Sequence, residues 1–184
     1  LLPVYGRFLN ELREEHSFSL LNSLKIEKPI IVTSDIAILY ELSSLHHNAS
    51  YSSGKKAVGV SPGLYGATFS EEKQRDFILA HSRVLDYLVE KYDIDVVFLP
   101  HEVSGMKNDD LALSREIMLR MKYEYKARIL CSKNLDDFKN YLRGLGLLIT
   151  SRMHSAVLAS SSFVPAVMIS YDHKQLGFFE QLDL

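Results

Sequence analysis

Two apolar runs near the C-terminus, residues 145–150 and 166–170, flank a segment rich in alanine and serine. The stretch from Leu147 to Lys174 therefore reads as strand, turn, helix, turn and strand. Neither run alternates apolar with polar residues, and strands that are buried on both faces show this pattern. Such strands occur in parallel sheets that are covered by helices, so this stretch favours the α/β class.

The chain from residue 57 onward repeats this alternation of apolar runs and helical segments. Further strands are predicted at residues 57–60, 94–99 and 127–130. Helices are predicted from Ser70 to Tyr92, from Asp109 or Asp110 to about Tyr123, from Asn134 to about Gly144, and over residues 175–181. We therefore predict a doubly wound α/β fold with a parallel sheet.

A polar segment, residues 43–56 (SSLHHNASYSSGKK), interrupts the pattern and reads as a linker. Before it, the sequence predicts only a helix at residues 18–24 and a strand at residues 29–32, too little for an independent domain. The chain opens with LLPVY and has no initiator methionine, so we expect that its natural N-terminus is missing.

Composition excludes several classes of protein. The formal net charge is −2 and the basic residues are scattered, which argues against a broad nucleic-acid surface. No apolar run approaches the ~20 residues of a membrane span. The single cysteine, Cys131, excludes an internal disulfide framework and a cysteine-rich zinc site, and we expect it to be buried at a strand end. One cysteine fits a reducing compartment, so we expect a cytoplasmic protein.

Ser151, Arg152 and His154 follow the first of the two apolar runs. In an open α/β sheet, ligands bind outside the carboxyl ends of the strands. The guanidinium of arginine suits a carboxylate or a phosphate, and histidine can donate or accept a proton near neutral pH. The N-terminus of the next helix adds a positive dipole end. These residues predict an anion site beside a proton donor; alternatively, the arginine pairs with a surface acid and the histidine caps a helix.

Polar residues also follow the other predicted strands. His101 is a second candidate for an acid or base, and Asp110 could orient a hydroxyl group or simply cap a helix. Ser61 and Gly63 follow the first strand, where the glycine admits a ligand or permits a turn. Lys174 could hold a phosphate or be a solvated lysine. Four other histidines are predicted to be surface or linker residues without a role, namely His16, His46, His47 and His81.

At these residues the chain resembles the polysaccharide pyruvyl transferase family. The last two of the matching pieces are the most specific. In order, these pieces are REEHS with a following leucine pair (13–21), TSDIAILYEL (33–42), VGVSPG (58–63), VVFLPHE (96–102), DD (109–110), SRMH (151–154) and VPAVMISYDHKQLGFFEQL (164–182). The chain departs from the family pattern at Met153, where leucine is usual, and at Ile36, where proline is frequent.

The resemblance implies a glycosyltransferase-like GT-B architecture with two Rossmann-like domains. Residues 1–42 would be the tail of a largely missing N-terminal domain, and residues 57–184 would form the C-terminal, donor-binding domain. The implied reaction transfers a pyruvyl group from phosphoenolpyruvate to a sugar of a cell-surface or extracellular polysaccharide and forms a ketal. No metal and no cofactor besides this donor are expected. The acceptor would be lipid-linked or nucleotide-linked, and a homo-oligomer is possible.

By analogy with the family, Arg13 and Arg152 would hold the anionic donor. His154 would be the proton donor or a phosphate ligand, with His101 as the second candidate. The predicted substrate-binding set is completed by Ser61, Gly63, Asp110, Ser151 and Lys174.

Two other functions stay open at this point. The first is a GT-B-type glycosyltransferase or sugar epimerase that uses a nucleotide-sugar, because those folds also place donor phosphates at the strand edge. The second is a non-catalytic sugar-binding subunit. Binding of phosphoenolpyruvate against nucleotide-sugars would discriminate the first of these functions from pyruvyl transfer.

Overall fold

The computed structural model describes residues 10–12, 15–24, 30–32, 35–39, 57–64, 70–105, 109–171 and 173–180. Its contacts divide the chain into two compact units, residues 39–169 and residues 1–38 with 170–184. The predicted linker at residues 43–56 lies outside the described residues, and the predicted domain boundaries remain predictions.

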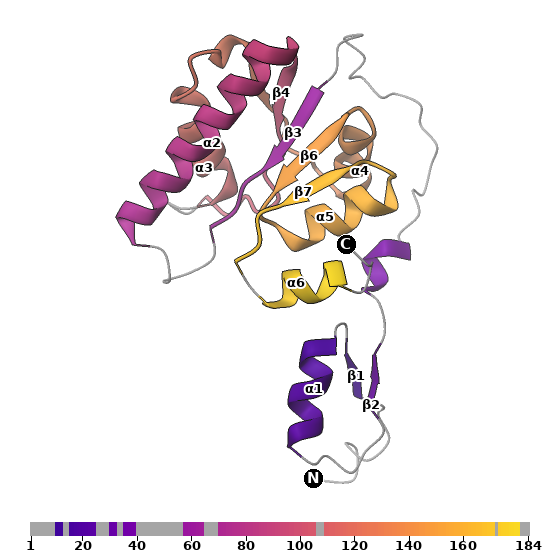
Figure 1. The fold of residues 1–184 in the computed structure, drawn as a ribbon. Coiled ribbons are helices and arrows are strands. Elements are labelled where there is room, and N and C mark those ends of the chain that lie inside the picture. Colours follow the sequence, from indigo (N-terminus) through magenta and orange to yellow (C-terminus); the bar gives the residue numbers. More distant parts are fainter. Residues whose placement is uncertain are drawn as a thin grey trace. The chain divides into compact units, whose positions relative to one another are not determined.

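The larger unit is built on one parallel sheet. Its strands lie in the order β5-β4-β3-β6-β7. The last four of these strands are labelled in Figure 1. Every neighbouring pair is parallel, as in the pairing of Val58 with Val96 on one side of β3 and with Leu147 on the other. The strands are β3 (Ala57–Ser61), β4 (Asp95–Phe98), β5 (Ala127–Ile129), β6 (Leu147–Thr150) and β7 (Ala166–Met168).

Helices cover both faces of this sheet, which confirms the predicted doubly wound α/β fold. The helices α2 (Glu71–Tyr92) and α3 (Asp110–Leu119) contribute to one apolar core. The helices α4 (Leu135–Arg143) and α5 (Met153–Ser161) contribute to the other. Successive side chains of a strand point to opposite faces, so Ala57 belongs to the second core and Val58 to the first.

The predicted helix starts are confirmed by their caps. The side chains of Ser70, Asp109 and Asn134 accept hydrogen bonds from backbone N–H groups three residues ahead, at 3.3, 2.8 and 2.9 Å. Each cap satisfies an N–H that the helix itself leaves without a partner. Gly144 ends α4, as predicted.

The predicted end of α3 near Tyr123 is wrong, because the helix ends at Leu119. The backbone N–H groups of Lys122 and Tyr123 donate to the carboxylate of Asp86 in α2 instead of continuing the helix. Met121 turns into the core, and a short 3₁₀ helix, η4 (Glu124–Lys126), leads into β5. A contact between two distant segments therefore overrides the local helical pattern.

The smaller unit holds a parallel pair of strands, β1 (Asn10–Leu12) and β2 (Ile30–Val32). Between them lies α1 (Glu15–Ser23), which begins three residues before the predicted helix start at Phe18. The last helix is α6 (His173–Glu180). The sequence analysis did not predict β1, because its three residues include two polar ones and carry no strand pattern. A second 3₁₀ helix, η2 (Ile36–Leu39), follows Asp35.

The described part of the chain contains no helix that is both long and apolar enough to cross a membrane.

The central position of Leu148 gives a test of the packing. Its side chain is fully buried in β6. We expect Leu148→Ala to lower the free energy of unfolding by about 2–5 kcal/mol, because it removes buried methyl groups and leaves a cavity. The control Leu119→Ala lies at the exposed end of α3 and should change the stability by less than about 0.5 kcal/mol. Urea unfolding measures both, and equal stabilities would contradict the described core.

Candidate active site at the switch point of the sheet

The order of the strands reverses at β3, whose neighbours are β4 on one side and β6 on the other. Ligands of open α/β sheets bind at such a switch point, outside the carboxyl ends of the strands. Ser61 ends β3, His101 follows β4 and Ser151 follows β6. All three residues therefore lie at one edge of the sheet, because the carboxyl ends of parallel strands meet there.

The segments after β3 and β6 are joined by hydroxyl groups. Thr150 Oγ1 donates to the carbonyl oxygen of Ser61 at 2.9 Å. Ser151 Oγ accepts from the backbone N–H of Gly63 and donates to its carbonyl oxygen, both at 2.7 Å. The predicted substrate-binding residue Ser151 is therefore fully buried and binds the backbone of Gly63.

Arg152 is held by two carboxylates. Its Nε donates to Asp110 Oδ2 at 3.0 Å. Its Nη2 lies 2.5 Å from Asp110 Oδ1 and 3.1 Å from Glu102 Oε2. The side chain of Asp110 is fully buried, whereas that of Glu102 is 57% exposed. The arginine is thus paired with acids, one of the two alternatives that the sequence left open, but the principal acid is buried.

Asp110 also organises the backbone around it. Its Oδ2 accepts hydrogen bonds from the N–H groups of His101 at 3.2 Å and Glu102 at 2.9 Å. The N–H of Asp110 in turn donates to the carbonyl oxygen of Glu102. One carboxylate therefore ties the segment after β4 to Arg152 after β6.

Gly63 makes room for the side chain of Arg152. A Cβ atom at this position would overlap Arg152 Nε and would lie 2.6 Å from Cδ and 2.8 Å from Cζ. These atoms are held by Asp110 and cannot easily move aside. The glycine is thus required by the close approach of the arginine.

His101 lies at the centre of the polar cluster. Its ring contacts Phe138 edge to face at a centroid distance of 5.4 Å and lies parallel to the ring of His154 at 6.3 Å. Its Nδ1 lies 3.3 Å from Ser155 Oγ. Although the residue retains solvent exposure, desolvation of the ring lowers the pKa of His101, and the nearby charges of His154 and Arg152 lower it further.

A polar hollow of about 210 Å³ opens beside His101. The start of α4 forms its other wall, with Asn134, Leu135 and Phe138 as lining residues together with Ser132 and Lys133. The sequence analysis missed the lining from α4 and the contact of Ser155 with His101. Ser155 stands one residue after His154, and no local pattern distinguishes it from the other serines of α5.

Two predicted site residues are not placed. Arg13 lies outside the described residues, and Lys174 belongs to α6 with its side chain outside them. Their predicted roles remain predictions.

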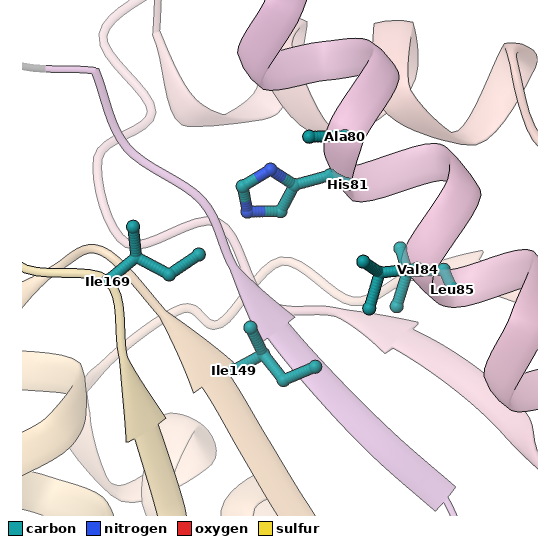
Figure 2. A pocket seen from close by; sticks show the side chains of 6 residues that line it. All are labelled: Ala80, His81, Val84, Leu85, Ile149 and Ile169. Atoms are coloured by element: carbon teal, nitrogen blue, oxygen red, sulfur yellow. The ribbon is translucent and has the colours of Figure 1, made fainter.

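A second hollow, of about 100 Å³, is apolar (Figure 2). The ring of His81 points from α2 into the space in front of Ile149 and Ile169. The prediction of a surface histidine is wrong: His81 is buried, its Nδ1–H donates to the carbonyl oxygen of Phe77, and burial lowers its pKa. Cys131 is exposed, contrary to prediction, because it follows β5 at the edge of the sheet.

The polar cluster combines a guanidinium, two imidazoles and the N-terminus of α5 at one edge of the sheet. Cationic and N–H groups of this kind bind phosphate or carboxylate, and imidazoles transfer protons near neutral pH. The sequence profile of polysaccharide pyruvyl transferases matches residues 12–173, a range that includes the whole cluster.

The chain belongs to the polysaccharide pyruvyl transferase family. The amylovoran biosynthesis protein AmsJ of Erwinia amylovora is 26% identical over 117 residues, which cover 60% of this chain. The match covers only 27% of AmsJ, so the chain spans about a quarter of that relative. The resemblance to this family that the sequence motifs indicated is therefore confirmed.

Two solved structures share the fold of this family member. A putative UDP-N-acetylglucosamine 2-epimerase from Listeria monocytogenes matches 89% of this chain with a TM-score of 0.59 at 16% identity. The structure of S. aureus MnaA with UDP matches 87% of the chain with the same score and identity. The matched parts are 42% and 41% of those proteins. The likeness concerns the fold and confirms its GT-B-like class.

The contact of Gly63 with Arg152 predicts that alanine is tolerated less well at Gly63 than at Gly146. Gly63→Ala should lower the free energy of unfolding by about 1–3 kcal/mol, because the new methyl group overlaps a side chain that Asp110 holds in place. The control Gly146→Ala would meet only the carbonyl oxygen of Ala57 at 3.7 Å and should be nearly neutral. Urea unfolding measures both variants, and a neutral Gly63→Ala would contradict the tight contact.

The burial of Asp110 predicts that the effects of substituting Arg152 and Asp110 on the stability depend on each other. Arg152→Ala should destabilise the protein by about 3–5 kcal/mol, because it leaves a buried carboxylate without its counter-charge. Adding Asp110→Asn should restore part of the loss, since the amide oxygen still accepts the backbone hydrogen bonds. Arg120→Ala removes a surface ion pair with Glu116 and serves as the control, with a change below about 1 kcal/mol. A double variant less stable than Arg152→Ala would refute the coupling.

Proposed function

We propose that this chain carries one side of the active site of a transferase that moves the pyruvyl group of phosphoenolpyruvate onto a sugar. The observation that supports the proposal most is the family match, which spans the cluster of His101, Arg152 and His154 at the switch point. The match to AmsJ, a protein of amylovoran biosynthesis, supports a polysaccharide as the destination of the sugar.

The proposed reaction balances without a redox partner. Two hydroxyl oxygens of the sugar form bonds to C2 of the donor, and the bond from C2 to the phosphate oxygen breaks. The two hydroxyl groups lose two protons. One proton is balanced by the proton that C3 gains as it becomes a methyl group, and the other leaves with phosphate. The chain must therefore hold an anion and deliver a proton.

Arg152 and the start of α5 supply the positive potential for the donor. The NH2 group of Arg152 bridges the buried Asp110 and the exposed Glu102. An incoming carboxylate or phosphate would take the place of Glu102, because that side chain can turn into water while Asp110 stays in place. Arg13 is the second cation of the proposal.

His154 is the proposed proton donor. It is the second residue of α5, is exposed, and lies two residues after Arg152. Its ring faces that of His101 across 6.3 Å. We propose that these two residues at the start of α5 divide the work: Arg152 holds the donor and His154 carries the proton.

The remaining parts of the proposal rest on the sequence and on the family resemblance. The reaction needs no metal or other cofactor beyond the donor. We expect a cytoplasmic reaction and an acceptor that is a lipid-linked or nucleotide-linked sugar of a cell-surface or extracellular polysaccharide.

The experiment that tests the proposal measures phosphate release from phosphoenolpyruvate by the full-length protein. A panel of lipid-linked and nucleotide-linked sugars serves as acceptors, and mass spectrometry detects the ketal. Release that requires an acceptor supports the proposal. Turnover of a nucleotide-sugar without phosphoenolpyruvate would favour the glycosyltransferase or epimerase alternative, and sugar binding without turnover would favour a non-catalytic subunit.

The role of His154 predicts a loss of turnover on substitution. His154→Gln should reduce kcat by roughly 10²–10⁴-fold, the usual contribution of a positioned acid or base. Much of the donor affinity should remain, because glutamine still donates a hydrogen bond. Ser160→Ala, six residues later on α5, is the control and should keep wild-type kcat. Near-normal turnover of His154→Gln would assign the proton to another group.

A further inference from the structure

A chain of three polar groups leads from the sheet to the ring of His101. Ser61 Oγ at the end of β3 lies 2.9 Å from Ser155 Oγ in α5. Ser155 Oγ lies 3.3 Å from His101 Nδ1. Both serines are fully buried, so their hydroxyl groups have each other and the imidazole as partners rather than water.

The number of protons in this chain determines the direction of its hydrogen bonds. Within the described residues, Ser155 Oγ is the one hydrogen-bond partner of Ser61 Oγ. If His101 Nδ1 is an acceptor, Ser61 donates to Ser155 and Ser155 donates to Nδ1, so every proton is used. If Nδ1 carries a proton, three donors share two hydrogen bonds and the buried hydroxyl proton of Ser61 has no acceptor.

A buried donor without an acceptor is unfavourable enough to shift such an equilibrium by about tenfold or more. We propose that Ser155, supported by Ser61, is a positioning residue that holds neutral His101 in the tautomer with its proton on Nε2. His101 then presents an N–H donor toward the polar hollow and accepts no proton there at neutral pH. The next step rests on the proposed function. This N–H would hold an oxygen of the bound donor, while His154 carries the proton.

Desolvation of the ring, the largest influence on its pKa, favours a neutral His101, while the charges around it act in both directions. His154 and Arg152 oppose its protonation, and Asp110 and Glu102 favour it. Burial opposes protonation most strongly, and the pKa of His101 is lowered overall. A second proton would have to reside on Nδ1, where it would also leave the Ser61 hydroxyl without an acceptor.

The test is ¹⁵N NMR of the histidine rings in the substrate-free protein, which reports the protonation of each ring nitrogen. Wild-type His101 should show a protonated Nε2 and an unprotonated Nδ1. In Ser155→Ala both tautomers should be populated and the titration midpoint should rise, because the neutral form loses its donor to Nδ1. Ser61→Ala should keep the wild-type tautomer, since Ser155 retains its proton for Nδ1, and Ser160→Ala should change nothing.

A protonated Nδ1 in the wild type would overturn the proposal. So would a Ser155→Ala variant that keeps the wild-type tautomer and midpoint while the His81 signals show a native fold. Because these spectra are recorded without substrate, they judge the role of Ser155 separately from the assay of pyruvyl transfer. If the spectra show the predicted tautomer but the assay shows no phosphate release, only the proposed function is refuted.

Discussion

The ion pair between Arg152 and Asp110 is the contact on which the arrangement of the site depends. The buried carboxylate binds the guanidinium of Arg152, which follows β6, and two backbone N–H groups of the segment after β4. A charged group without water requires such partners, since an isolated buried carboxylate is very unfavourable. The pair therefore fixes the segments after β4 and β6, the two strands that flank β3, at the edge where a ligand would bind. Gly63 completes the arrangement because it leaves space for the arginine.

This constraint divides the site into an inner and an outer part. The inner part consists of buried groups whose partners lie inside the protein: Asp110 binds Arg152, and Ser61 contacts Ser155. The outer part contains Glu102 and His154, which are exposed at the rim. A rigid inner part holds reactive groups in one geometry, which is the condition for orienting a substrate. In the proposed function, the exposed rim leaves room for an anion to exchange with the carboxylate of Glu102.

Much of the fold could be predicted from the sequence because its signals are local. Apolar runs without alternation indicate buried parallel strands, and Ser70, Asp109 and Asn134 are good N-cap residues. The predictions failed where contacts between distant segments decide. Asp86 ends α3 early by binding backbone groups 36 and 37 residues away. The strand β1 exists because β2 pairs with it, and its own residues carry no such signal.

The sequence by itself determined the class of the fold, the family, and the residues that follow each strand at the ligand-binding edge. These properties depend on the order of residues along the chain, through hydrophobic periodicity and short motifs. Only the tertiary structure decided what those residues bind: Arg152 pairs with a carboxylate 42 residues away, and Ser155 meets a histidine 54 residues away. Residues this distant in the sequence are brought together by the packing of helices on the sheet. No local sequence pattern predicts which of them come into contact.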